Sequence, residues 1–141
     1  MAIGMTMPES AQVSGDTHFG PSPFMVLSRE HDAQTTIVTV EGELDLSSAP
    51  RLKWMMMDAF EAGRSQLVVD LSRASFMDST GLGVLIGVNK RLQPGTQLAI
   101  VCPPGAVAQV FEFSGTDGAF SLFPTLQAAI AHLEGRAPEA G

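Results

Sequence analysis

The chain has 141 residues, an apolar fraction of 45% and a formal charge of −7. This length suits one domain with a single core, and the scattered lysines and arginines argue against nucleic acid or an anionic membrane surface as a partner. The one cysteine, Cys102, excludes an intrachain disulfide and a cysteine-based zinc cluster, and favours a reducing, cytoplasmic location.

Composition divides the chain into three parts. Residues 1–23 are rich in Ser, Gly, Pro and Thr and predict a disordered arm, in which Met5 and Met7 are alternative start positions. Residues 24–134 form the expected domain, and residues 135–141 a flexible tail. The arm lacks the pattern of a signal peptide, and the longest apolar run, residues 81–88, is too short to span a bilayer.

Two strands open the predicted domain. Residues 24–29 and 35–40 alternate as strands do, and the polar residues 30–33 form the turn between them. The stretch from Gly42 to Leu46 is expected to lead, as a loop, into a helix.

That helix is predicted to be capped by Ser47 or Ser48, to hold Pro50 in its first turn and to end at Gly63. Its apolar stripe consists of Leu52, Met55, Met56 and Ala59. Trp54 and Met57 point away from this stripe, so they are candidates for an additional contact surface.

A continuous apolar run, residues 66–71, predicts a buried central strand that ends in a compact turn. The remaining predicted elements are a helix from Ser79 to about Leu92, a strand over 97–102, a helix over 106–113, a short strand over 120–123 and a helix capped by Thr125. This alternation predicts an α/β fold: a mostly parallel central sheet of four to five strands with helices packed against it.

The residues between the central strand and the next helix are the most informative. Asp78 and Ser79 place a carboxylate beside a hydroxyl at a helix N-terminus, where unpaired N–H groups and the helix dipole favour an anion. From the residues alone, Ser79 is either the N-cap of the helix or a hydroxyl that can become a phosphate.

Four segments together resemble the STAS domain, in particular the bacterial anti-sigma factor antagonists. They are Val40-Glu41-Gly42-Glu43-Leu44-Asp45, Ala49-Pro50-Arg51-Leu52, Val69-Asp70-Leu71 and Phe76 to Gly83. The resemblance covers residues 24–133 and implies a single STAS-type domain.

The resemblance also implies a phosphorylation cycle. The serine after the aspartate, here Ser79, is phosphorylated by a partner anti-sigma factor that is itself a serine kinase. The unphosphorylated antagonist binds that anti-sigma factor and releases the sigma factor; phosphorylation breaks the complex, and a serine phosphatase resets it. The loop from Gly42 to Leu46 is implied to lie beside Ser79, which makes Asp45 and Asp78 partner contacts.

Two glycines mark one face of the Ser79 helix. Thr80, Gly83, Gly87, Lys90 and Arg91 share this face, although an interior glycine costs a helix about 1 kcal/mol relative to alanine. A smooth surface for another protein is one explanation, and we add Thr80, Gly83, Gly87 and Lys90 to the predicted partner-binding residues. Close packing within the domain is the alternative.

Enzymatic readings fit the sequence poorly. A nucleophile elbow needs Gly-x-Ser-x-Gly, whereas Met77 occupies the first position here, and none of the three histidines is placed for a triad. A phosphate-binding loop is absent from the sequence, and Asp45 and Asp78 suggest a loop contact and a turn residue rather than a metal site. We therefore expect no catalysis, cofactor or metal; the remaining alternatives are a STAS subunit of a transporter or sensory complex and, as the least favoured, a small serine hydrolase.

Overall fold

A computed structural model describes residues 24–135 of the chain, so the predicted arm and most of the predicted tail lie outside the described residues. The elements follow one another as β1 (Met25–Glu30), β2 (Thr35–Leu44), α1 (Ala49–Glu61), β3 (Gln66–Met77), α2 (Ser79–Lys90), β4 (Gln97–Val101), α3 (Ala106–Ser114), the short 3-10 helix η1 (Asp117–Ala119), β5 (Ser121–Phe123) and α4 (Leu126–Leu133).

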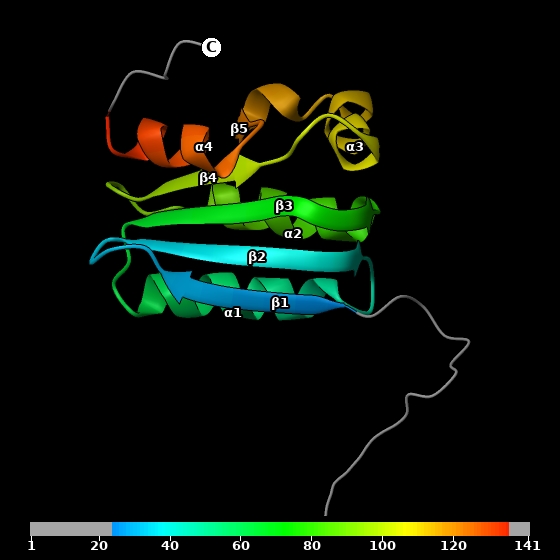
Figure 1. The fold of residues 1–141 in the computed structure, drawn as a ribbon. Coiled ribbons are helices and arrows are strands. Elements are labelled where there is room, and N and C mark those ends of the chain that lie inside the picture. The colour runs from blue at the N-terminus through cyan, green and yellow to red at the C-terminus, as the bar shows by residue number, and fades with distance from the viewer. Residues whose placement is uncertain (1–23, 136–141) are drawn as a thin grey trace, which may run out of the picture.

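The five strands form one sheet in the order β1-β2-β3-β4-β5. β1 pairs antiparallel with β2, and all other pairs are parallel. In Figure 1, β1 and β2 run in opposite directions, with α1 and α2 behind the sheet. This arrangement confirms the predicted α/β class. Because α1 and α2 each follow a parallel strand, both begin at the same edge of the sheet, the edge where β2 and β3 end.

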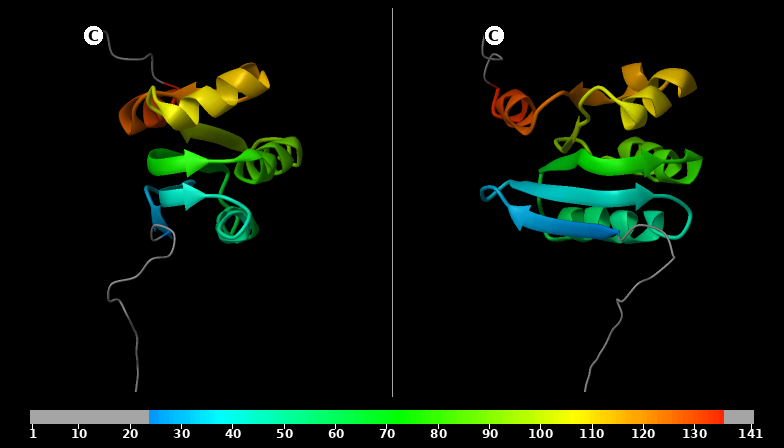
Figure 2. Two further views of the ribbon diagram at one scale, coloured as in Figure 1. Left: turned by 90° about the vertical axis from the view of Figure 1, so that its right-hand side faces the viewer. Right: turned by 45° about the vertical axis from the view of Figure 1, so that its right-hand side comes forward.

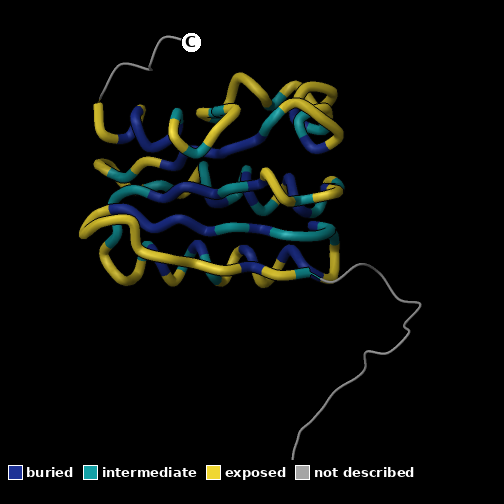
Figure 3. The backbone as a smooth tube through the Cα atoms, in the orientation of Figure 1, coloured by how far each residue is buried: buried dark blue, intermediate teal, exposed yellow. Residues whose placement is uncertain are grey.

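Helices cover both faces of the sheet, but unequally. Figure 2 shows α1 and α2 on one side and α4 on the other. The larger core lies under α1, α2 and α3 and includes Leu52, Val69, Leu85 and Phe111. The smaller core, under α4, contains Ile37 and Val68 with Ala129 and Ile130. Figure 3 shows the result: the middle strands are largely buried, whereas β1 and the β1–β2 turn are mostly exposed.

Two predicted loops are instead parts of strands. β2 continues through Gly42 to Leu44, and β3 runs past Leu71 to Met77, where we expected a compact turn. The two extensions pair with each other, up to Leu44 opposite Met77, across two register irregularities. A polar stretch from Ser72 onward is compatible with a strand here because β4 ends opposite Asp70, so this half of β3 has only one neighbour.

The other boundaries agree to within one or two residues. α2 ends at Lys90 rather than Leu92, and Thr125 caps α4 as predicted, its hydroxyl accepting a bond of 3.1 Å from the Ala128 N–H. Ser48 occupies the N-cap position of α1, yet its hydroxyl donates to the Glu43 carbonyl (2.7 Å) instead of capping the helix. None of the described helices is both long enough and apolar enough to cross a membrane.

Candidate functional site

The start of α2 is capped by Asp78 and not by Ser79. Asp78 has an extended backbone, and one carboxylate oxygen accepts bonds from the N–H groups of Thr80 (2.8 Å) and Gly81 (3.1 Å). The sequence-based expectation of unpaired N–H groups at this helix start is therefore wrong for these two. The carboxylate already occupies the position where an external anion would bind.

Ser79 is left with a free hydroxyl. It is the first residue of α2 and is exposed, and its side chain forms no hydrogen bond with any residue in the described part of the chain. Since Asp78 supplies the cap, the helix does not need this hydroxyl. The arrangement leaves Ser79 accessible to a modifying enzyme without loss of a structural contact.

The β2–α1 loop lies beside this helix start, as the resemblance implied. The Asp78 N–H donates to the Leu44 carbonyl (3.1 Å), which ties the beginning of α2 to the end of β2. Asp45 follows directly, and its carboxylate accepts bonds from the Ser47 hydroxyl (2.8 Å) and from the N–H groups of Ser47 and Ser48. These bonds, first of all the one from the Ser47 hydroxyl, lower the pKa of the Asp45 carboxyl. Asp45 is thus a charged loop residue held in place by its own loop.

Gly81 explains how closely the two segments approach. A methyl group on Gly81 would lie 2.8 Å from Leu44 Cγ and 3.0 Å from both the Leu44 carbonyl oxygen and Met77 Cγ. Only glycine allows the first turn of α2 to sit against the ends of β2 and β3 in this way. Sequence reasoning missed this role because nothing local in the chain indicates that Leu44 lies there.

Gly83 and Gly87 behave in the opposite way. Apart from its chain neighbours and the backbone of α2 itself, a methyl group on either would meet no atom within 4 Å. Packing within the described domain therefore does not explain these two glycines. Instead, they line an open groove between α1 and α2.

We call this surface the α1–α2 groove. It consists of two hollows, of about 350 and 520 Å³, that share Lys53, Met57, Thr80 and Val84. The first is completed by Gly83, Gly87, Val88 and Arg91, and the second by Leu46, Ala49, Pro50, Trp54 and Glu61. Both volumes fall in the range of about 300–1,000 Å³ typical of ligand sites.

The groove includes residues that sequence analysis had only partly identified. Trp54 is 70% exposed and Leu46 74% exposed, both high values for large apolar side chains. In the sequence, the position of Trp54 and Met57 outside the apolar stripe of α1 was the feature that indicated a contact surface here. Lys90 is exposed at the end of α2 but does not line the groove; its neighbour Arg91 does.

The two histidines in the described residues lie away from Ser79. His31 occupies the β1–β2 turn, at the opposite end of the sheet from the start of α2, and His132 packs its ring against Phe123 (5.0 Å between centroids). Neither forms a hydrogen bond with Ser79 within the described residues. A Ser-His arrangement for hydrolysis is therefore not assembled there.

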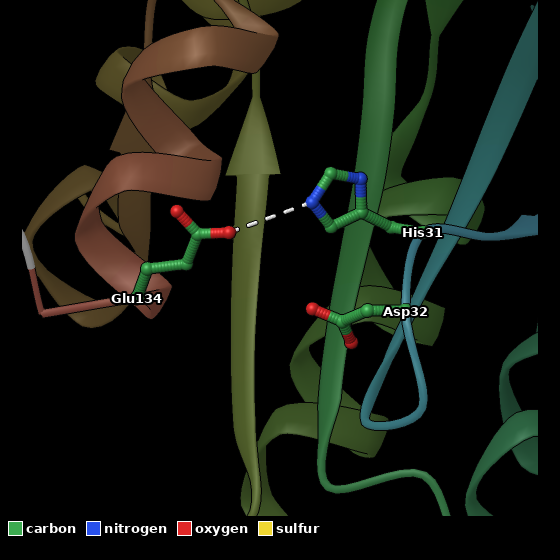
Figure 4. Close-up of side chains that lie close together, drawn as sticks. All are labelled: His31, Asp32 and Glu134. Atoms are coloured by element: carbon green, nitrogen blue, oxygen red, sulfur yellow. Dashed lines mark ion pairs between the residues drawn. The ribbon is translucent and has the colours of Figure 1, made fainter.

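A cluster of ligating side chains lies at that opposite end (Figure 4). The ligand atoms of His31, Asp32 and Glu134 lie within 4.8 Å of one another. His31 Nε2 is 3.5 Å from Glu134 Oε2, and the Asp32 carboxylate accepts bonds of 2.8 Å from the N–H groups of Gln34 and Thr35. These interactions close the β1–β2 turn and connect it to the end of α4.

Comparisons with known proteins agree on one family. The family model described as "STAS domain" matches residues 27–129. The chain is 25% identical over 115 residues to the anti-sigma-F factor antagonist RsfB of Mycobacterium tuberculosis, covering 82% of this chain and 93% of the relative. It is 35% identical over 79 residues to an anti-sigma-B factor antagonist of Staphylococcus aureus, covering 55% of this chain and 73% of the relative. The fold is similar to the crystal structure of an anti-sigma factor antagonist from Mycobacterium paratuberculosis, with a TM-score of 0.76 and 30% sequence identity. The match covers 82% of this chain and 97% of that protein.

Proposed function

We propose, because this chain belongs to the STAS domain family, that it is an anti-sigma factor antagonist controlled by phosphorylation of Ser79. Two relatives that carry this name align with this chain over 93% and 97% of their own length. The observation that carries the site assignment is the exposed Ser79 hydroxyl, which is free of hydrogen bonds to described residues and directly precedes Thr80, a residue that lines the open groove.

In the unphosphorylated state, the antagonist binds an anti-sigma factor and the sigma factor is released. The proposed contact surface surrounds the start of α2 and continues along the helix. It consists of Asp45, Asp78, Thr80, Gly83, Gly87 and Lys90. Its glycines allow the backbone of a partner to approach α2 closely.

Phosphorylation would act through local charge. A phosphate on Ser79 adds about −1.5 to −2 charges beside the Asp78 carboxylate. Since that carboxylate already accepts the N–H groups of Thr80 and Gly81, the phosphate gains little compensation from the helix start. Burying it under a partner is unfavourable, and a loss of about 3 kcal/mol would weaken the complex more than a hundredfold.

The chemistry of the cycle belongs to the partners. The anti-sigma factor is the serine kinase and supplies the ATP site, while a serine phosphatase removes the phosphate. The antagonist itself contributes an acceptor hydroxyl and needs no cofactor or metal. We place the cycle in the cytoplasm, where the single cysteine stays reduced.

A kinase assay tests the modified residue. When the protein is incubated with its anti-sigma factor kinase and ATP, we expect one phosphate per molecule. Mass spectrometry should locate this phosphate at Ser79. Ser79→Ala should abolish the modification, whereas the neighbouring Thr80→Ala should retain it. A phosphate at Thr80 in the wild-type chain, with Ser79 unmodified, would contradict the assignment.

A binding assay tests the switch. By calorimetry, Ser79→Ala should bind the anti-sigma factor with an affinity close to that of the wild type, and Ser79→Asp more weakly. Aspartate carries one charge, so its effect should be smaller than that of phosphate. Equal affinities of the phosphorylated and unphosphorylated wild type would exclude the switch and favour a STAS subunit of a transporter or sensory complex, in which Ser79 has no such role.

A further inference from the structure

The α1–α2 groove combines apolar surface with unpaired positive charge. Trp54, Met57 and Val84 supply the apolar part; of the cations, Lys53 lines both hollows and Arg91 lines the first. The side chains of Lys53 and Arg91 form no ion pair or hydrogen bond within the part of the chain that the structure describes. Glu61 lines one hollow together with Lys53, yet no ion pair joins these two side chains in the described structure.

From this combination we propose that the α1–α2 groove binds an acidic, amphipathic segment of the anti-sigma factor: an apolar side chain against Trp54 and Met57, with carboxylates beside Lys53 and Arg91. This inference rests on the proposed function and specifies the chemistry of its partner. Exposed tryptophan is a frequent centre of binding energy in protein interfaces. Complementary charge around such a centre orients the partner and excludes others.

The groove is arranged to accept a segment along both helices. On α1 the lining residues are Pro50, Lys53, Trp54, Met57 and Glu61. On α2 they are Thr80, Gly83, Val84 and Gly87, followed by the C-cap residue Arg91. Both sets have the i, i+3, i+4, i+7, i+11 spacing of one helix face. Glu61 lines only the second hollow, whereas the first is lined by both Lys53 and Arg91, so we expect the carboxylates of the partner in the first hollow.

The groove is also continuous with the proposed switch. Thr80 lines both hollows and follows Ser79 directly in the chain. Because Lys53 lines the same hollows as Thr80, a phosphate on Ser79 would repel a carboxylate held beside Lys53. Arg91 lies about 18 Å further along the helix, beyond the reach of this repulsion in physiological salt. The repulsion at Lys53 gives the phosphate a second means of breaking the complex, in addition to its own desolvation.

Paired variants test the groove. The anti-sigma factor kinases of the source organism are purified and their affinities for the wild-type chain are measured. The kinase that binds most tightly is the probe. Calorimetry should show a dissociation constant raised at least about tenfold for Trp54→Ala and for Lys53→Glu. Higher salt should weaken binding of the wild type more than binding of Lys53→Glu, because an ion pair is screened.

Each variant has a matched control. Phe113→Ala removes an aromatic side chain that is 84% exposed on α3. Arg29→Glu makes the same change of charge on β1, three positions after the buried Val26 and thus on the other face of the strand. Both controls should change the dissociation constant less than about twofold, and thermal melts should confirm that all four variants are folded.

The outcomes separate the two proposals. If the wild type binds but the groove variants bind within about twofold of it, or if the controls lose as much affinity as the groove variants, the groove inference is wrong while the proposed function stands. If the wild type binds none of the anti-sigma factor kinases of its organism, the proposed function itself is wrong. Loss of binding only in the groove variants, with Ser79-dependent control of the wild type retained, supports both.

Discussion

At the scale of single residues, Asp78 and Ser79 are neighbours with separate tasks. Asp78 caps α2 through the N–H groups of Thr80 and Gly81, so Ser79 can be modified while the cap remains. If Ser79 were the cap, a phosphate on its oxygen would alter the contact that starts the helix. The separation keeps the modification from disturbing the fold.

Gly81 is the residue at this site where a side chain is least tolerated. Gly81→Ala would place a methyl group 2.8 Å from Leu44 Cγ and 3.0 Å from the Leu44 carbonyl oxygen. We expect the free energy of unfolding to fall by about 1–3 kcal/mol, as for other overpacked sites. Chemical denaturation followed by circular dichroism measures this change.

The control is Gly83→Ala, two positions later in the same helix. No atom lies within 4 Å of the added methyl group, so the higher helix propensity of alanine should raise the free energy of unfolding by up to about 1 kcal/mol. Equal effects at the two positions would show that the contact of Gly81 with Leu44 is not the deciding factor.

Cys102 is predicted to be an unreactive thiol. It is buried at the end of β4, and burial, followed by the nearby Glu112 carboxylate, raises the pKa of its thiol. Because the thiolate is the reactive form, its fraction at pH 7 should be smaller than in a free cysteine and should increase only as the pH approaches the raised pKa. A thiol reagent such as DTNB should therefore react slowly with the native protein and rapidly after unfolding in guanidinium. Immediate reaction of the native protein at pH 7 would contradict this prediction.

At the scale of elements, α2 presents two different surfaces. Leu82, Leu85 and Val88 are buried in the larger core, whereas Gly83 and Gly87 open to the groove. The helix thus joins the sheet on one side and leaves a smooth stripe on the other. The parallel course of α1 beside it supplies the second wall of the groove.

The stripe leads to a prediction at Gly87. Gly87→Gln should leave the melting temperature unchanged or slightly raised, because a side chain there enters open space and leaving glycine favours the helix. The same side chain should obstruct a partner docked on α2, so affinity for the anti-sigma factor should fall by about tenfold or more in calorimetry.

Gly118→Gln is the matched control, since Gly118 also has open space around it but lies in η1. Gly118→Gln should bind the anti-sigma factor with the affinity of the wild type. A clear fall in the melting temperature of Gly87→Gln, or undiminished binding, would remove this face of α2 from the proposed contact surface.

At the scale of the whole molecule, the proposed switch needs no change of fold. Ser79 is exposed at the start of α2, which follows the end of β3, and the two cores lie beneath the helices. A phosphate there adds charge to a chain that is already acidic. Because Asp78 keeps the cap of α2 and Ser79 makes no structural contact with described residues, we expect the effect on association rather than on folding.

Thermal melting tests this expectation. The phosphorylated and unphosphorylated chains should melt within about 2 °C of each other, because a surface change away from packed contacts usually alters stability by less than about 0.5 kcal/mol. Ser79→Ala serves as a reference for loss of the hydroxyl alone. A large drop in the melting temperature on phosphorylation would indicate that the switch acts by loosening α2.

The order of elements, the α/β class and the position of Ser79 at a helix start were all predictable from the amino-acid sequence. These features depend on local chemistry: apolar periodicity, proline and glycine at helix ends, and short polar side chains at caps. The apolar run of residues 66–71 and the alternation of residues 35–40 therefore predicted their strands correctly. The resemblance to the STAS domain also depended on local motifs, and the family comparison confirmed it.

The contacts between these elements could be identified only from the three-dimensional structure. β3 extends beyond Leu71 because the end of β2, about 30 residues earlier in the chain, pairs with it. Gly81, Gly83 and Gly87 are the same residue type in one helix, yet Leu44 packs against the first and nothing packs against the other two. The α1–α2 groove exists because two helices from separate parts of the chain lie side by side. Such features depend on neighbours distant in sequence, and no local pattern specifies which neighbours those are.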